Sequence, residues 1–280
     1  MAILIDFNQV VIASIMVAFG HKKHANINED MIRHLALNSL RYYRTRFKDK
    51  YGELVICCDD KRSWRKDIFP YYKAHRKKDR DESDMDWKLI FDIIDKMKQE
   101  LVEYFPYKVI HITKAEADDI IGLLCRIADE DTVIVSSDKD FRQLQTNKYI
   151  TQWSPRTKRF IRDKDPMTYL KEHIIRGDRT DGIPNFLSKD DTFVNGSRQR
   201  RITEKRLTGW MDCEVEGFDE NKLRGFKRNE QLINLLFTPA EIQKEIIDTY
   251  NEKHDAKRNK IFGYFIKHRM KMLMNDLQDF

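Results

Sequence analysis

Carboxylates in this sequence fall directly after three short apolar runs, and each run has the length and composition of a buried strand. These runs are residues 3–5, 54–58 and 132–135. The acids that follow them are Asp6, Asp59, Asp60, Asp138 and Asp140. Because the carboxyl ends of parallel strands lie along one edge of a sheet, these side chains are expected to meet there, where open α/β folds place their sites.

Two further acidic groups can reach the same edge. One opens a helix in AEADDII and the other follows a helix in RGDRTDG; their acids are Glu116, Asp118, Asp119, Asp178 and Asp181. So many carboxylates repel one another unless cations neutralise them, and oxygen-only ligands favour Mg²⁺ or Mn²⁺ over zinc. Two such ions about 4 Å apart can hydrolyse a phosphodiester. Each acid alone could instead be a turn, capping or first-turn residue, so the interpretation depends on all five groups together.

Positive charge is concentrated in one segment of a chain whose formal net charge is +6. Residues 61–80 hold nine basic and two acidic side chains, with four aromatic residues interleaved. Cations beside stacking surfaces are typical of single-strand binding, although a solvated helix face is the alternative. Lys73 and Arg76 are three residues apart, so on a helix they would share one face. A second basic cluster consists of Arg198, Arg200, Arg201, Lys205 and Arg206.

The elements that must position these residues alternate between strands and helices. Strands are expected at 3–5, 54–58, 108–112, 132–135 and 149–153, and helices at 9–19, 28–47, 86–104, 115–128 and 139–144. This alternation predicts an α/β fold with a mostly parallel central sheet and helices on both faces. Beyond about residue 164, only helices are expected, near 166–175, 203–210, 239–250 and 257–276, with a polar loop at 187–202.

We therefore expect an α/β domain over 1–165 that carries the acidic site, and a smaller all-helical domain over 166–280. The chain has 280 residues and 41% hydrophobic residues, which excludes a wholly disordered protein. No apolar run approaches 18 residues, so no membrane span is expected. A signal peptide is rejected because the N-terminus lacks a basic start and Asp6 interrupts its apolar region. Four cysteines without CxxC spacing indicate reduced thiols and a cytoplasmic protein.

Several segments resemble the structure-specific 5′ nucleases, a family that includes flap endonucleases and the 5′ nuclease domains of bacterial DNA polymerases. The similarity is greatest to the bacteriophage branch. The resembling segments are LIDFNQ (4–9), VICCDD (55–60), WRKDIFPYYKAHR (64–76), EADDII (116–121), SSDKDF (136–141), QWSP (152–155) and GDRTDGI (177–183). They occur in the order found in the family and span most of the chain.

The resemblance implies a Mg²⁺-dependent 5′→3′ exonuclease with flap endonuclease and ribonuclease H activity, which removes RNA primers during lagging-strand replication. The implied substrates are 5′-flap or forked DNA and RNA–DNA hybrids, and the implied cofactor is two Mg²⁺ ions, for which Mn²⁺ can substitute. A single-stranded DNA-binding protein and a sliding clamp are implied as partners. We expect a monomer in the cytoplasm, which is that of the host if the chain is phage-encoded.

The resemblance also assigns roles to individual residues. Those implied around a first metal are Asp6, Asp59, Glu116, Asp118 and Asp138. Those implied around a second metal are Asp138, Asp140, Asp178 and Asp181. Asp118, Asp138, Lys73 and Arg76 are the implied catalytic residues, with Asp119 in support. A basic arch over the site, about 61–85, would pass the 5′ strand; its implied nucleic-acid contacts are Arg65, Lys66, Tyr72, Lys73, Arg76 and Lys77.

Duplex binding in cellular relatives uses a glycine-rich helix–hairpin–helix, and its glycines are missing after GDRTDGI. Arg198, Arg200 and Arg201 are expected to contact the duplex phosphates instead. Two other functions stay open. A PIN-type endoribonuclease shares an acidic strand-end site, but it would be about half this length and needs no arch. A non-catalytic nucleic-acid-binding protein would use only the basic segments and would gain nothing from eight carboxylates facing the phosphates.

Overall fold

The computed structural model describes residues 1–20, 27–83, 85–254 and 258–280, and within them the strands form one sheet with the order β3-β2-β1-β4-β5-β6. The strands are β1 (Ala2–Asp6), β2 (Leu54–Cys58), β3 (Lys108–His111), β4 (Thr132–Val135), β5 (Ile150–Ser154) and β6 (Arg159–Ile161). The first five are parallel, and β6 pairs antiparallel with β5. Strand order therefore reverses between β1 and β4, and a crevice forms at the carboxyl ends of strands at such a reversal.

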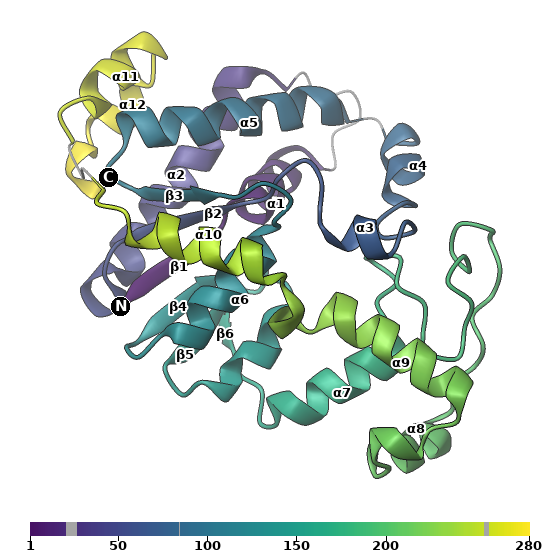
Figure 1. Ribbon diagram of the computed structural model, residues 1–280. Coiled ribbons are helices and arrows are strands. Elements are labelled where there is room, and N and C mark those ends of the chain that lie inside the picture. Colours follow the sequence, from purple (N-terminus) through teal and green to yellow (C-terminus); the bar gives the residue numbers. More distant parts are fainter. Residues whose placement is uncertain (21–26, 84, 255–257) are drawn as a thin grey trace.

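Helices cover both faces of this sheet, as predicted (Figure 1). One face packs against α1 (Phe7–Phe19), α2 (Glu29–Tyr51) and α5 (Trp87–Tyr104), and the other against α6 (Ala117–Ile127) and α10 (Ala240–Asn251). Ile3 and Ile5 of β1 belong to the first core, whereas Leu4 belongs to the second. Because both faces are buried, the central strands are continuous apolar runs rather than alternating ones.

The C-terminal helices divide between two places. A third core contains residues of α7 (Pro166–Arg176), α8 (Glu204–Met211) and α9 (Glu220–Ile233), together with Phe69 and Tyr72. By contrast, α10, α11 (Ile261–Lys267) and α12 (Lys271–Met274) return to the sheet, and the buried Phe280 belongs to the first core. The 3₁₀ helices are Asp140–Thr146, Val215–Gly217, Leu235–Phe237 and Leu277–Asp279. None of the described helices is both long and apolar enough to cross a membrane.

Two sequence predictions for this region were wrong. The single helix expected at 257–276 is interrupted at Arg269, whose φ of 53° lies in the left-handed region, so α11 and α12 are separate. Helix α9 was not predicted, and its centre holds Gly225, a residue that usually disfavours a helix interior. A Cβ at Gly225 would lie 1.9 Å from the carbonyl oxygen of Phe186, so close packing requires the glycine.

The basic arch contains two short helices, α3 (Arg65–Ile68) and α4 (Arg76–Asp81). Lys73 precedes α4 and has a φ of 54°, so Lys73 and Arg76 do not share a helix face, contrary to the prediction. The loop predicted at 187–202 has no helix or strand, and it is tied to the third core. There the Asn185 side chain donates to the carbonyl of Arg200, whose N–H donates in turn to Ser188.

Candidate metal centre

The site begins at the strand-order reversal between β1 and β4. Asp6 is the last residue of β1 and also the N-cap of α1, so its carboxylate accepts a hydrogen bond from the N–H of Gln9 at 3.2 Å. The same carboxylate accepts one from Ser136 Oγ, just after β4, at 3.0 Å. Asp6 is only 6% exposed, so its carboxylate has left bulk water. The ends of the two strands are thus joined around a buried acid.

The end of β2 is connected to the start of α6. Asp59 Oδ1 accepts a hydrogen bond from the N–H of Ala117 at 2.8 Å, which places this acid beside the first turn of α6. Asp118 is the next residue of that helix. Burial, followed by the charge of Asp138, raises the pKa of Asp118, and Asp6 and Glu116 add to it, so acids from β1, α6 and the segment after β4 share one electrostatic environment.

Glu116 is the point at which the arch meets the acidic edge. It caps α6 in a reciprocal capping box with Asp119. Its carboxylate accepts hydrogen bonds from Arg65 Nη1 at 3.0 Å, from Tyr72 Oη at 2.9 Å and from Lys73 Nζ at 2.6 Å. Burial alone would raise the pKa of Glu116, but the neighbouring Lys73 and Arg65 lower it to about 2. Glu116 is therefore a stable anion.

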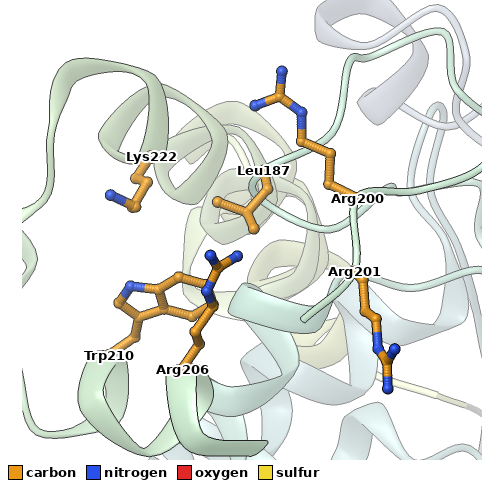
Figure 2. Close-up of a pocket in the computed structure, with 6 residues that line it drawn as sticks. All are labelled: Leu187, Arg200, Arg201, Arg206, Trp210 and Lys222. Carbon is orange, nitrogen blue, oxygen red and sulfur yellow. The ribbon is translucent and has the colours of Figure 1, made fainter. Parts of the chain in front are cut away.

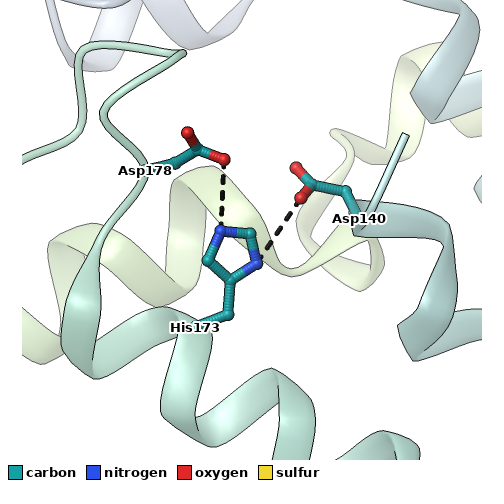
Figure 3. Close-up of side chains that lie close together, drawn as sticks. All are labelled: Asp140, His173 and Asp178. Carbon is teal, nitrogen blue, oxygen red and sulfur yellow. Dashed lines mark hydrogen bonds and ion pairs between the residues drawn. The ribbon is translucent and has the colours of Figure 1, made fainter. Parts of the chain in front are cut away.

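A second group of side chains joins the 3₁₀ helix after β4 to the end of α7. Figure 3 shows the imidazole of His173 between two carboxylates. Its Nε2 lies 3.1 Å from Asp178 Oδ2, and its Nδ1 lies 3.4 Å from Asp140 Oδ1. Lys139 Nζ approaches the same oxygen of Asp178 at 2.9 Å. Although burial opposes it, the contacts with His173 and Lys139 lower the pKa of Asp178.

Asp181 connects this second group to the arch. Its carboxylate lies 2.7 Å from Arg76 Nη2 and accepts a hydrogen bond from Tyr72 Oη at 2.9 Å. Lys73 Nζ is 3.5 Å from the same carboxylate, and the N–H of Lys73 donates to the carbonyl of Asp181 at 2.8 Å. Lys73 and Arg76 are therefore both directed at acids of the site.

Carboxylates at the centre of this edge resist ionisation. Burial, followed by the charges of Asp59 and Asp138, raises the pKa of Asp6 to about 8. Burial and neighbouring acids also raise the pKa values of Asp138 and Asp140. A cation would offset the burial and the mutual repulsion of these carboxylates, because it favours the ionised form of every carboxylate near it.

The donors fit divalent cations. Asp140, His173 and Asp178 each offer one ligand atom, and these atoms lie within 4.8 Å of one another. Asp140 Oδ1 and His173 Nδ1 are buried, and apart from their 3.4 Å contact with each other, neither has a hydrogen-bond partner among the described residues. Buried polar atoms are normally paired, so this arrangement is suited to a cation between them.

Comparison of the sequence with known proteins assigns the chain to a family. The model of the 5′-3′ exonuclease N-terminal, resolvase-like domain matches residues 3–174. The chain belongs to the 5′-3′ exonuclease family. A model of the C-terminal part of T4 RNase H matches residues 165–280. The chain is 33% identical to the ribonuclease H of Enterobacteria phage T4, over 99% of this chain and 95% of that protein. This 5′-3′ exonuclease family member is therefore a nuclease of the 5′ type.

Other relatives share the family fold at lower identity. The flap endonuclease of bacteriophage T5, solved as a pseudo-enzyme-product complex with DNA and metal ions, has a TM-score of 0.60 and 14% identity, covering 90% of this chain and 99% of its own. The zinc-bound T5 5′-exonuclease has a TM-score of 0.59 and 15% identity, covering 89% and 98%. DNA polymerase I of Streptococcus pneumoniae is 28% identical over 145 residues, which are 47% of this chain and 16% of that protein.

Eight of the acids singled out in the sequence lie at the expected edge, whereas Asp60 contacts Lys114 and His111, and Asp119 pairs with Arg65. Those of the first group, Asp6, Asp59, Glu116, Asp118 and Asp138, surround the ends of β1, β2 and β4. Asp140, Asp178 and Asp181 form the adjoining group, and Asp138 has electrostatic contacts with both groups. Their assignment to two particular metals stays a prediction.

Two residues predicted to contact nucleic acid are buried. Arg65 is 2% exposed and binds Asp119 and Glu116 through its guanidinium, so it is an internal ion-pair partner and not a phosphate contact. Tyr72 is also 2% exposed, and its hydroxyl is bonded to the acidic site, so its ring cannot stack on a base in this arrangement. The other predicted contacts are at least partly exposed, and their roles stay predictions: Lys66, Lys73, Arg76, Lys77, Arg198, Arg200 and Arg201.

Sequence reasoning missed His173 and Lys139. The acids were expected to act without a histidine partner, but the imidazole of His173 lies between Asp140 and Asp178, at 3.4 and 3.1 Å. The signal was present: His173 stands five residues before Asp178, on the last turn of an amphipathic helix that leads into the acidic segment. Lys139 lies between two site acids in SSDKDF, and its charge partly neutralises Asp178.

Stability without a divalent cation is expected to fall between about pH 5 and pH 8. Over this window Asp6, with its pKa raised from 3.8 to about 8, keeps a proton in the folded state that the unfolded chain has released. The lowered pKa values of Glu116 and Asp178 matter only below about pH 4.5, where their contribution to stability is lost. A cation replaces the proton on Asp6, so Mg²⁺ should stabilise the fold more at pH 8 than at pH 6.

Thermal unfolding in EDTA and in Mg²⁺, at both pH values, measures this difference. A rise in midpoint on adding Mg²⁺ that is equal at pH 6 and pH 8 would contradict the assignment of Asp6 to a cation site.

Proposed function

We propose that the protein is a Mg²⁺-dependent 5′→3′ exonuclease and flap endonuclease that cleaves duplex DNA and RNA–DNA hybrids and removes RNA primers during lagging-strand replication. One observation carries this proposal: in a chain of the 5′-3′ exonuclease family, eight carboxylates meet at a strand-order reversal, and Lys73 and Arg76 pair with two of them, Glu116 and Asp181. Acids alone would repel a phosphodiester, whereas acids with cations beside them can bind it.

Each side chain has a distinct role in this proposal. Asp6, Asp59, Glu116, Asp118 and Asp138 would hold one Mg²⁺, and Asp138, Asp140, Asp178 and Asp181 the other. Ions held by these residues would supply a hydroxide nucleophile and stabilise the leaving oxygen. Lys73 and Arg76 exchange their carboxylate partners for the scissile phosphate and orient it. Asp119 keeps Glu116 in place through the capping box.

Substrate contacts extend beyond the acidic edge. Lys66 and Lys77 are exposed on the arch and would follow the 5′ strand of a flap or fork, while Arg198, Arg200 and Arg201 would bind duplex phosphates. A monomer in the host cytoplasm, assisted by a single-stranded DNA-binding protein and a sliding clamp, completes the proposal, and these points rest on the family resemblance alone. The PIN-type and non-catalytic alternatives lose their support, because family models match both halves of the chain.

A nuclease assay tests the proposal directly. A 5′-flap substrate and an RNA–DNA hybrid, each labelled at one end, are incubated with Mg²⁺, with Mn²⁺ or with EDTA. We expect products that shorten from the 5′ end, cleavage near the flap junction, and no products in EDTA. Cleavage that persists in EDTA, or products with the opposite polarity, would show that the proposed reaction is wrong.

Replacing Lys73 and Arg76 together by Ala is expected to lower the single-turnover rate at saturating substrate by about 10²-fold. These cations are aimed at Glu116 and Asp181, so their loss misplaces the phosphate, and a misplacement of about 1 Å can cost that much. The matched control is Lys78→Ala with Arg80→Ala, which removes the same charge from exposed positions of α4. Equal losses in the two double variants would mean that only the overall charge of the arch matters.

A further inference from the structure

A cavity of about 640 Å³ lies away from the acidic edge, in the C-terminal helical region (Figure 2). Its walls come from α8, α9 and the preceding loop, and the lining residues are Leu187, Arg200, Arg201, Arg206, Trp210 and Lys222. Helix α8 packs against α7, and Arg176 at the end of α7 pairs with Glu204 at the start of α8 at 3.0 Å. Helix α8, which lines the cavity, therefore packs directly against α7, the helix that carries His173.

Four of the six lining residues are cations and none is an acid. Lys222 pairs with Asp219. For Arg200, Arg201 and Arg206, no carboxylate of the described part of the chain lies within ion-pair distance. Most other cations of the site region, such as Lys73 and Arg76, do have acidic partners. Three guanidinium groups without counter-charge around one hollow favour an anionic ligand.

The cavity also has a planar apolar wall. Trp210 contacts Phe186 edge to face, with ring centroids 4.9 Å apart and an interplanar angle of 76°. Phe186 is only 2% exposed, so a rigid neighbour fixes the orientation of the indole. Leu187 extends the apolar surface, and Figure 2 shows Arg206 and Trp210 together on α8, whereas the side chains of Arg200 and Arg201 leave the loop in different directions. Stacking on a fixed aromatic ring costs little conformational entropy.

We propose that this cavity binds one unpaired nucleotide of a single-stranded segment, with its base against Trp210 and its phosphate against Arg206. A planar ring next to phosphates is the one feature that matches both walls, and base stacking beside cations is how single strands are held. A base within a duplex is already stacked on its neighbours, so it cannot enter. The inference rests on the proposed function for its ligand class, a nucleic acid.

Fluorescence anisotropy with a labelled oligothymidylate, and with a blunt duplex of equal length, tests the inference. EDTA is present throughout, so that nothing is cleaved. Trp210→Leu removes the aromatic ring and should weaken oligothymidylate binding about tenfold, since stacking contributes about 1–3 kcal/mol per base. Its effect on the blunt duplex should be at most about twofold. Trp210→Phe keeps a ring and should restore most of the affinity.

A second pair of variants, one in the cavity and one outside it, tests the contribution of the positive charges. Arg206→Gln should weaken oligothymidylate binding and reduce the slope of log K against log salt by about 0.7, the value for one lost single-strand phosphate contact. Lys205→Gln removes the same charge from the neighbouring exposed position of α8, which does not line the cavity, and should change the slope less. Because Arg206 is exposed, this pair stays informative even if the Trp210 variants are unstable.

Two results would overturn the inference: equal losses on the oligothymidylate and the duplex in Trp210→Leu, or equal salt slopes for Arg206→Gln and Lys205→Gln. The outcome is separable from the proposed function. Mg²⁺-dependent cleavage together with unaltered oligothymidylate binding by the variants would refute only the cavity. If the variants lose oligothymidylate binding but the wild-type protein cleaves neither nuclease substrate, only the nuclease proposal is refuted.

Discussion

Replacing Asp118 by Asn should reduce cleavage by more than about 10³-fold, while substrate binding stays intact or becomes tighter. Asn keeps the shape of the side chain but loses the charge that would hold a divalent cation. A factor of 10³ corresponds to about 4 kcal/mol, which is within what a metal contributes by stabilising charge in the transition state. Binding is spared because one source of repulsion toward the phosphates is removed.

The matched control for this variant is Asp60→Asn. Asp60 also follows β2, but its carboxylate accepts from the N–H of Lys114 and contacts His111 at 3.2 Å, outside the acidic group. Single-turnover cleavage in Mg²⁺, with affinity measured separately in EDTA, distinguishes chemistry from binding. Wild-type turnover by Asp118→Asn, or an equal loss in Asp60→Asn, would rule out the metal role of Asp118.

The second large effect is expected from Asp119→Ala, which should lower the free energy of unfolding by about 3–5 kcal/mol. Asp119 is fully buried and accepts two hydrogen bonds from Arg65, at 2.9 and 3.1 Å. It also accepts from Trp64 Nε1 at 3.2 Å and from Thr238 Oγ1 at 2.9 Å. Without it, a guanidinium that is 2% exposed keeps only Glu116 as a charged partner among the described residues.

Urea unfolding measures this loss, and Asp118→Asn serves as its control. The pKa of Asp118 is raised by burial, so neutralising it should leave the unfolding midpoint unchanged or increase it. Replacing both partners, as in Arg65→Met with Asp119→Leu, removes the unpaired charge and should recover part of the lost stability. An unfolding midpoint in Asp119→Ala equal to that of the wild type would mean that the buried pair contributes nothing.

The acidic edge could be predicted from the sequence because it depends on local signals and one topological rule. Strands β1, β2 and β4 are short apolar runs closely followed by acids, and parallel strands bring their carboxyl ends together. The alternation of strands and helices predicted a parallel sheet, but the strand order that places β1 beside β4 was not predicted. Helix α9 was not predicted in this way, because Gly225 disfavours a helix interior. The glycine is needed instead for close contact with the backbone of Phe186, which is distant in sequence.

The sequence did not predict which side chains of the arch are buried and which are exposed. Arg65 and Lys66 are adjacent and chemically similar in the sequence, yet one is buried and the other exposed. The difference comes from distant residues: Arg65 Nε donates to the carbonyl of Leu232 at 2.9 Å, across 167 positions of the chain. No local pattern encodes such a contact. His173 escaped notice for a related reason, because Asp140 comes from a different part of the fold.

The contacts between the arch and Asp181 have a thermodynamic consequence. Lys73 and Arg76 occupy the carboxylate of Asp181, and Gly182 is held so closely beneath the arch that a Cβ would lie 3.1 Å from the carbonyl of Tyr71. In the proposed reaction, a phosphate strand that draws these cations away would free Asp181 for a metal ion. Linkage is reciprocal, so whatever factor the strand adds to the affinity for metal, the metal must add to the affinity for the strand. Departure of the cleaved strand would return the cations to Asp181 and weaken the hold on the ion, so that each turnover resets the site.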